Sequence, residues 1–135
     1  MPLFLHNISG FTIVHDPIQC CLHLTWQGAH SARDAQFCCL EVLAQVHLTA
    51  STKILNDATL DGAGWHDITP WLAHEFFTQL AVDGVTAVAW VIPRNLRAHS
   101  SMDQVINTVK QLTIGKFEDV ESAYTWLCQW QVITY

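Results

Sequence analysis

The segment TKILND at residues 52–57, followed by ATLDGAGW at residues 58–65, decides how this chain is expected to fold. A short apolar run typical of a β-strand ends in Asn56 and Asp57, and a loop rich in Gly and Asp leads into a helical pattern. In an open α/β sheet, ligands bind in the crevice outside the carboxyl ends of the strands. The segment therefore predicts a strand–loop–helix unit and the edge of the sheet at which a functional site would lie.

Two strand patterns and a helix precede this segment. Residues 11–15 alternate between apolar and polar side chains, and residues 18–26 form a second run after the turn at Asp16 and Pro17. Two such runs joined by a short turn predict an antiparallel hairpin. Ser31 is a typical N-cap, and the apolar residues after it recur at helical spacing, which predicts a helix of about four turns.

Further alternating units follow the segment. Thr69 and Pro70 have the residue types of an N-cap and a first helical position, although a start near Trp65 fits the pattern equally well. The other expected elements are a buried strand at 85–92, a helix capped by Asn95, a short strand at 114–117 and a helix capped by Asp119. The order β-β-α-β-α-β-α-β-α predicts one α/β domain over residues 1–135: a mixed sheet that starts with a hairpin and has helices packed on it. The tail from residue 129 is compatible with a frayed end or an edge strand.

Composition excludes several classes of function. Half of the 135 residues are hydrophobic and the formal net charge is -6, without a basic stripe, so no binding of nucleic acid is expected. The N-terminal residues lack a basic region, and the longest apolar run has only strand length, so neither a signal peptide nor a membrane span is expected. The five cysteines are an odd number without CxxC spacing, which favours buried thiols over disulfides in a cytoplasmic protein.

The motifs of known catalytic and cofactor sites are missing. Eight histidines are many, but His66 and His74 lie eight residues apart, whereas metal-binding pairs on a helix are four apart. The segment 62–64, GAG, lacks the Lys-Ser/Thr of a P-loop and the third Gly of a dinucleotide fingerprint. We therefore predict no catalytic set, no metal and no cofactor.

Four segments carry a resemblance to a known family. They are KILND at 53–57, the helical pattern at 65–84, AVAWV at 87–91 and FEDVESAYTWL at 117–127. Together with the order of elements, they resemble the SpoIIAA-like fold of the STAS superfamily, and most closely the small bacterial STAS-like proteins related to CRAL-TRIO lipid-binding domains. The resemblance covers nearly the whole chain and implies a regulatory module that binds another protein.

The chain departs from this family at the phosphorylated position. Anti-sigma-factor antagonists of the superfamily carry a D-S-[ST]-G segment after the third strand, and a partner kinase phosphorylates its first Ser. The matching residues here are Asp61, Gly62, Ala63 and Gly64, none of which has a hydroxyl group. Thr59 is the only hydroxyl in the loop and is the candidate substitute phosphosite.

These observations define a candidate binding loop and three functional hypotheses. The loop consists of Asn56, Asp57, Thr59, Asp61, Gly62, Trp65 and His66. The first hypothesis is a non-catalytic STAS-like module that binds a protein partner or a second copy of itself as a homodimer, in line with the high apolar content. The alternative is a carrier of a small apolar molecule or lipid, as in CRAL-TRIO domains. The third is an enzyme with an unrecognised site near Asp57, Asp61 and His66.

Overall fold

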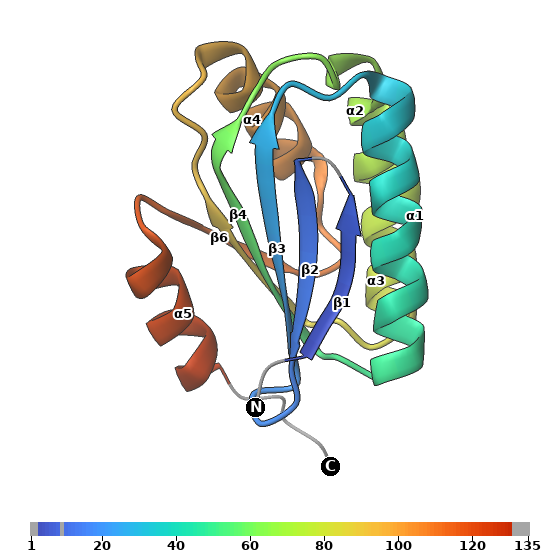
Figure 1. Ribbon diagram of the computed structural model, residues 1–135, viewed down its shortest axis with the longest axis vertical. Coiled ribbons are helices and arrows are strands. Elements are labelled where there is room, and N and C mark those ends of the chain that lie inside the picture. The colour runs from blue at the N-terminus through green and yellow to red at the C-terminus, as the bar shows by residue number, and fades with distance from the viewer. Residues whose placement is uncertain (1–2, 9, 131–135) are drawn as a thin grey trace.

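The strands lie side by side in the order in which they occur in the chain (Figure 1). The computed structural model describes residues 3–8 and 10–130, with side chains from residue 10 onward. The strands are β1 (Leu3–Ile8), β2 (Phe11–Asp16), β3 (Cys21–Gly28), β4 (Lys53–Asp61), β5 (Ala87–Val91) and β6 (Thr113–Phe117). The pairs β1–β2 and β2–β3 are antiparallel, and the three later pairs are parallel. The predicted mixed α/β sheet, with a hairpin followed by alternating units, is confirmed.

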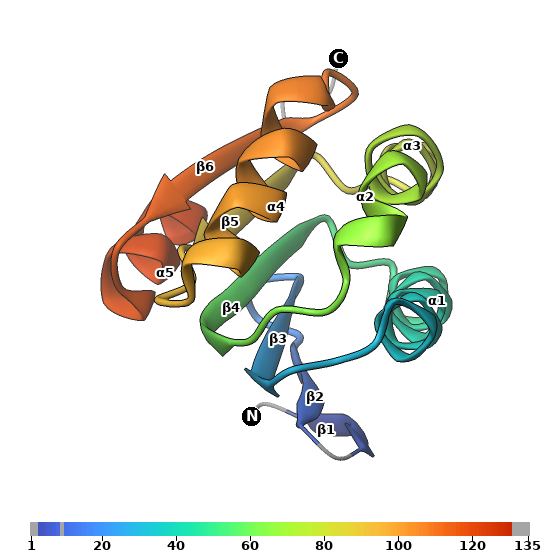
Figure 2. The ribbon, with the colours of Figure 1, turned by 90° about the horizontal axis from the view of Figure 1, so that it is seen from above.

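The helices that connect the parallel strands all cover one face of the sheet (Figure 2). They are α1 (Ala32–Thr49), the helical segment that contains α2 (Thr69–Trp71) and α3 (Phe77–Val82), and α4 (Leu96–Thr108). Right-handed crossovers between strands that follow one another in both sequence and space must place every connecting helix on the same side. The last helix, α5 (Val120–Gln129), has no strand after it in the described residues and packs on the opposite face.

The two faces of the sheet have separate hydrophobic cores. On β3, Leu22 and Leu24 belong to the large core under α1, α3 and α4, whereas Cys21 belongs to the small core under α5. This division follows from the alternation of side chains along a strand. On the α5 side, the buried Lys53 donates a hydrogen bond from Nζ to the carbonyl oxygen of Leu127 (3.0 Å) and so ties α5 to β4.

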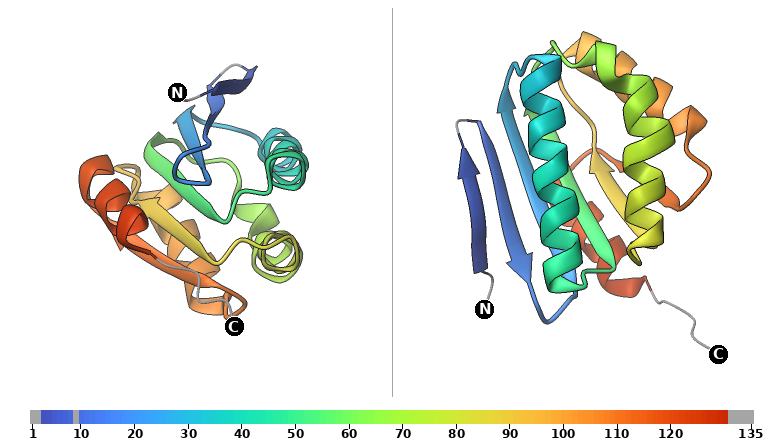
Figure 3. Two further views of the ribbon diagram at one scale, coloured as in Figure 1. Left: turned by 90° about the horizontal axis from the view of Figure 1, so that it is seen from below. Right: turned by 90° about the vertical axis from the view of Figure 1, so that its right-hand side faces the viewer.

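The strands differ from those expected in three main respects, apart from ends that differ by one or two residues, as in β5, which spans Ala87–Val91 rather than 85–92. The sequence predicts no strand before residue 11, but β1 pairs with β2 and forms one edge of the sheet (Figure 3). The second predicted strand starts at Cys21 rather than at residue 18, because residues 17–20 form the turn. The expected loop after Asp57 is still strand, since β4 continues to Asp61 and pairs there with Gly28 across an irregularity in the register. The first and third outcomes depend on backbone pairing with a neighbouring strand. The turn is local, because the side chain of Asp16 accepts hydrogen bonds from the N–H groups of Ile18 and Gln19.

The helical segment before β5 begins earlier than Thr69. A 3₁₀ turn (His66–Ile68) leads into α2, so the start near Trp65 is the correct alternative and Pro70 lies in the first turns. The predicted N-caps of the other three helices are confirmed, because Ser31, Asn95 and Asp119 each accept a backbone hydrogen bond. Of the tail that was expected to fray or to form an edge strand, Gln129 is the last residue of α5, and residues 131–135 lie outside the described residues.

Candidate functional site

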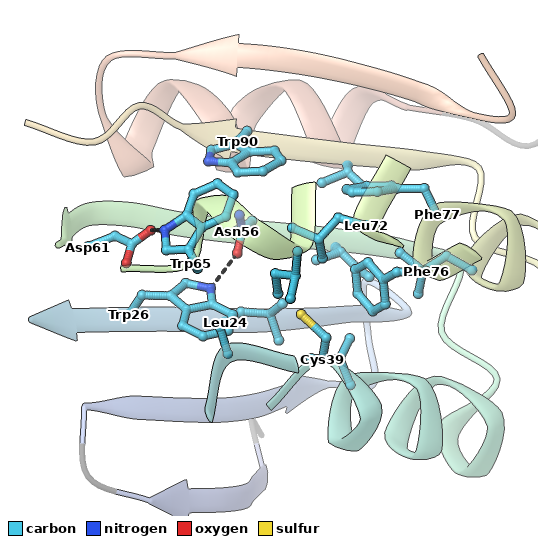
Figure 4. A pocket seen from close by; sticks show the side chains of 16 residues that line it. Leu24, Trp26, Cys39, Asn56, Asp61, Trp65, Leu72, Phe76, Phe77 and Trp90 are labelled. Atoms are coloured by element: carbon cyan, nitrogen blue, oxygen red, sulfur yellow. Dashed lines mark hydrogen bonds between the residues drawn. The ribbon is translucent and has the colours of Figure 1, made fainter. Parts of the chain in front are cut away.

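An apolar pocket lies between the sheet and helices α1 to α3 (Figure 4). Its cavity has a volume of about 60 Å³. The residues that line it come from β3, α1, β4, the helical segment 65–82 and β5: Leu24, Trp26, Ala35, Cys39, Val42, Ile54, Asn56, Asp61, Trp65, Ile68, Leu72, Phe76, Phe77, Leu80, Val88 and Trp90. Among these side chains, only Asn56 and Asp61 have carbonyl or carboxyl oxygens. The pocket therefore offers few hydrogen-bond acceptors.

Two indole rings are held in place by the oxygens of β4. Trp26 donates a hydrogen bond from Nε1 to Asn56 Oδ1 (2.8 Å), and Trp65 donates one from Nε1 to Asp61 Oδ2 (3.0 Å). Trp26 also packs against Phe11, with ring centroids 4.2 Å apart. These contacts fix the orientation of two indole rings that line the pocket.

Asp61 is a buried carboxyl group in an apolar wall. Its side chain is only 6% exposed, and burial raises its pKa from 3.8 to about 7, against the smaller opposing effect of the hydrogen bond from Trp65. Loss of hydration disfavours the charged form of an acid, which explains the direction. A buried acid with a raised pKa in a cleft is a mark of functional sites.

Some buried polar atoms of the structure have no partner. Within the described residues, His30 Nδ1, Asp61 Oδ1 and Trp90 Nε1 are buried without a hydrogen bond. Asp61 and Trp90 both line the pocket, and Figure 4 shows the nitrogen-bearing edge of Trp90 turned toward the end at which Asp61 lies. An unpaired buried polar group costs roughly 1–3 kcal/mol, so two of them in one pocket need an explanation.

The helical wall of the pocket contains a π-helical turn. In the segment Leu72–Phe76, the carbonyl oxygen of Leu72 accepts a hydrogen bond from the N–H of Phe77, five residues later. Phe76 and Phe77 are both buried, and the ring of Phe77 stacks on that of Trp90 with centroids 6.3 Å apart. Single π-helical turns occur often at functional sites, and this one places two consecutive aromatic side chains on the pocket.

The structure separates the seven residues of the predicted binding loop. Asn56, Asp61 and Trp65 line the pocket. Asp57 and Thr59 alternate with the inward-facing Ala58 and lie on the other face of β4, where Asp57 Oδ1 accepts a hydrogen bond from Thr59 Oγ1 (2.6 Å).

The remaining two residues of that loop lie outside the pocket. His66 is exposed, with its Nδ1 3.2 Å from Ser101 Oγ, and Gly62 belongs to the turn after β4. The set Asp57, Asp61 and His66, proposed as an enzyme site, is therefore not brought together.

Gly62 has a steric reason to lack a side chain. A Cβ atom at this position would lie 2.7 Å from the backbone nitrogen of Ala29, closer than real Cβ contacts allow. The N–H of Gly62 also donates a hydrogen bond to the carbonyl oxygen of Gly28 (2.8 Å). The turn after β4 therefore packs directly on the connection between β3 and α1, with no room for a serine.

Sequence reasoning missed most of the pocket wall. The sequence patterns do not mark Trp26, Phe77 or Trp90 as site residues, and Trp90 lies in the strand that the sequence predicts to be buried, which its burial confirms. The alternation of Leu22, Leu24 and Trp26 along β3 carried the signal for Trp26, because these side chains share one face. No comparable signal exists for Phe77, whose place depends on the π-helical turn.

The cysteines and histidines form no metal site in the part of the chain that the structure describes. No group of three or more His, Cys, Asp or Glu side chains there is arranged to hold a metal ion. The expected burial of all five cysteines is wrong for two of them, because Cys20 and Cys128 are exposed while Cys21, Cys38 and Cys39 are buried.

Comparisons with known proteins identify no relative of this chain. No family model, no curated protein and no solved structure matches it. Among the described residues, none of the helices combines the length and apolarity needed to cross a bilayer. The fold and the pocket thus define the protein only by class: an α/β protein with an aromatic pocket between sheet and helices.

Proposed function

We propose that this protein is a non-catalytic binding module that holds a small, mainly apolar molecule between its sheet and helices. The observation that carries the proposal is the aromatic pocket, with Asp61 buried in its wall. A largely apolar pocket with a few convergent polar groups and a titratable residue of perturbed pKa is the usual form of a ligand site.

The size of the cavity limits the ligand. One water needs roughly 10–15 Å³ of such volume, so about 60 Å³ holds about four to six water-sized groups. A small organic molecule of that size fits, whereas a long lipid chain does not. The proposal is therefore narrower than the carrier hypothesis drawn from the sequence.

Native mass spectrometry of protein purified from its own cells tests the proposal. We expect a bound small molecule on the wild type. Ala35, which lines the pocket on α1, is replaced by Leu to fill the cavity, and Ala44→Leu on the exposed side of the same helix serves as the matched control. The adduct should be lost in Ala35→Leu and kept in Ala44→Leu, with both variants checked for folding by circular dichroism. Wild-type protein that carries no adduct, and whose melting temperature does not rise with a small-molecule extract of the same cells, would overturn the proposal.

A second candidate function, favoured by one surface feature, is the STAS-like module that binds a second copy of itself. Phe37, Leu40 and Leu48 are 53%, 51% and 74% exposed and follow one another on the outer face of α1. Two copies of this stripe can cover each other about a two-fold axis, since such an interface uses the same surface twice. In light scattering at tens of micromolar, we expect a dimer that Leu40→Glu dissociates and that Gln104→Glu, on the exposed side of α4, leaves intact. A monomeric wild type contradicts this candidate.

A further inference from the structure

The pocket contains an acidic group that no basic side chain balances. Asp61 is 6% exposed, and among the described residues that line the pocket none is Lys, Arg or His. The indole N–H of Trp65 and the backbone N–H of Gly62 favour the ionised carboxyl group, but both are neutral donors. Because buried charges in proteins are normally paired, a carboxylate at this position lacks a counter-ion that a ligand could supply.

Aromatic side chains gather at the end of the pocket where Asp61 lies (Figure 4). Three tryptophans line it, and they are Trp26, Trp65 and Trp90. Trp65 is hydrogen-bonded to Asp61, and Trp26 to Asn56 Oδ1 (2.8 Å). Asn56 is in turn the partner of Trp90 in the pairing of β4 with β5. An indole ring attracts a cation through its π-electrons more strongly than other side chains do, so this end of the pocket suits a positively charged ligand.

The pocket has few acceptors for the N–H groups of a ligand. Asn56 Oδ1 already accepts a hydrogen bond from Trp26, and Asp61 Oδ2 accepts one from Trp65. A primary ammonium group has three N–H donors, which would lose their water in the pocket without finding enough acceptors. A fully methylated ammonium group has no N–H donor, and its methyl groups match the apolar wall.

We propose that the ligand is a methylated ammonium compound whose positive charge is balanced by Asp61 and whose methyl groups contact the indole rings of the pocket. The inference rests on the proposed function, because it names the class of ligand for the same pocket. Methyl groups form nearly all of the surface of such a cation, in line with a mainly apolar ligand. The cavity of about 60 Å³ holds about four to six non-hydrogen atoms, which is the size of a trimethylammonium group with a short substituent.

Binding of this cation should depend on pH through Asp61. Burial raises the pKa of this carboxyl group to about 7, and the cation pairs with the ionised form, so its affinity should rise as the pH rises through this value. Cys39, on α1, also lines the pocket, but burial raises the pKa of its thiol far above the usual value and keeps it neutral. His30, which packs edge-on against Trp26, and the exposed His66 do not line the pocket.

The test compares three probes that share a tetrahedral shape and a size: tetramethylammonium, tert-butylammonium and tert-butanol. They separate a methylated cation from a cation with N–H donors and from a neutral molecule. Binding is followed in ¹H–¹³C NMR spectra of the whole protein by the methyl signals of the pocket, such as those of Val42, Ile54 and Leu72. Molecules this small bind with dissociation constants on the order of millimolar, so titrations run to tens of millimolar, against sodium chloride at the same ionic strength.

At pH 8.5 we expect tetramethylammonium to bind at least tenfold more tightly than tert-butanol, and more tightly than tert-butylammonium. At pH 6 its affinity should fall about tenfold, because only about a tenth of the Asp61 carboxyl groups are then ionised. Asp61→Asn should weaken tetramethylammonium at least tenfold at pH 8.5 and abolish the pH dependence, while it leaves tert-butanol unchanged. Asp67→Asn is the matched control, because it removes the same charge from an exposed position and should change neither affinity.

The outcomes separate this inference from the proposed function. The methylated-ammonium inference is overturned, and the binding pocket stands, if tert-butanol binds as tightly as tetramethylammonium or if tert-butylammonium binds more tightly. The same holds if the affinity of the wild type for tetramethylammonium does not rise with pH, or if Asp67→Asn weakens it as much as Asp61→Asn does. If no probe perturbs the methyl signals of the pocket, and xenon does not either, both proposals are overturned.

Discussion

Replacing Asp61 by Asn should change how the stability of this protein depends on pH. The carboxamide has nearly the same shape, keeps an oxygen that can accept the hydrogen bond from Trp65 Nε1, and is neutral at every pH. The substitution therefore removes the titration of a buried group while it leaves the packing around the pocket in place.

The sign of the effect follows from the raised pKa of Asp61. In the unfolded chain the carboxyl group loses its proton near its ordinary pKa of 3.8, whereas in the folded protein burial raises the pKa to about 7. Between these values the folded state holds a proton that the unfolded state has lost, so the free energy of unfolding falls as the pH rises. At about 1.36 kcal/mol per pKa unit, a rise of roughly three units is worth about 4 kcal/mol. The contribution of Asp61 to the stability of the wild type is therefore largest below pH 3.8 and is lost between pH 3.8 and pH 7, with about 2.7 kcal/mol of the loss between pH 5 and pH 7.

Urea unfolding of wild type and Asp61→Asn at pH 5 and pH 8.5, followed by tryptophan fluorescence, measures the difference. We expect the free energy of unfolding of the variant, relative to that of the wild type, to rise by about 2–3 kcal/mol between pH 5 and pH 8.5. Asp67→Asn is the matched control, because it removes the same charge from an exposed position in the 3₁₀ turn. Contributions common to all three proteins cancel in the comparison. If Asp61→Asn gains no more stability than Asp67→Asn between the two pH values, the reasoning about Asp61 is refuted.

Three further predictions concern other parts of the molecule. Gly62→Ser, which restores the hydroxyl of the STAS motif, should destabilise the protein by about 1–3 kcal/mol through its clash with the backbone of Ala29, whereas Ala63→Ser should change the urea midpoint little; equal midpoints would contradict the clash. Lys53→Ala should cost about 2 kcal/mol and speed amide hydrogen exchange in α5, because the hydrogen bond to the carbonyl oxygen of Leu127 is lost; unchanged exchange in α5 would show that the bond does not hold the helix. Iodoacetamide at pH 8 should modify two thiols of the native protein and spare three, as counted by mass spectrometry, since the latter are buried and burial raises their thiol pKa values; the reaction of a third thiol before unfolding would contradict this. The reactive pair is Cys20 and Cys128, and the protected thiols are Cys21, Cys38 and Cys39.

Much of the fold could be predicted from the sequence because its signals are local. Each confirmed N-cap acts within one helical turn, as Ser31 does by accepting the N–H of Asp34 at 3.1 Å. The strands β2 and β5 follow from alternation or from a continuous apolar run inside the strand itself. By contrast, β1 and the last part of β4 form through hydrogen bonds to other strands, which no local pattern encodes.

The residues of the site likewise fall into those that the sequence indicates and those that only the tertiary structure brings together. The sequence alone placed Asn56, Asp61 and Trp65 in one short stretch at the end of a strand, where an α/β sheet forms its sites. Only the tertiary structure decided which side chains of that stretch meet, because alternation along β4 turns Asp57 away from the pocket. The structure also brings Trp90 from β5, 29 residues after Asp61, to the same pocket. The pairing of strands that are distant in sequence sets these neighbours, and it leaves Asp61 and Trp90 each with one unpaired polar atom in an apolar interior.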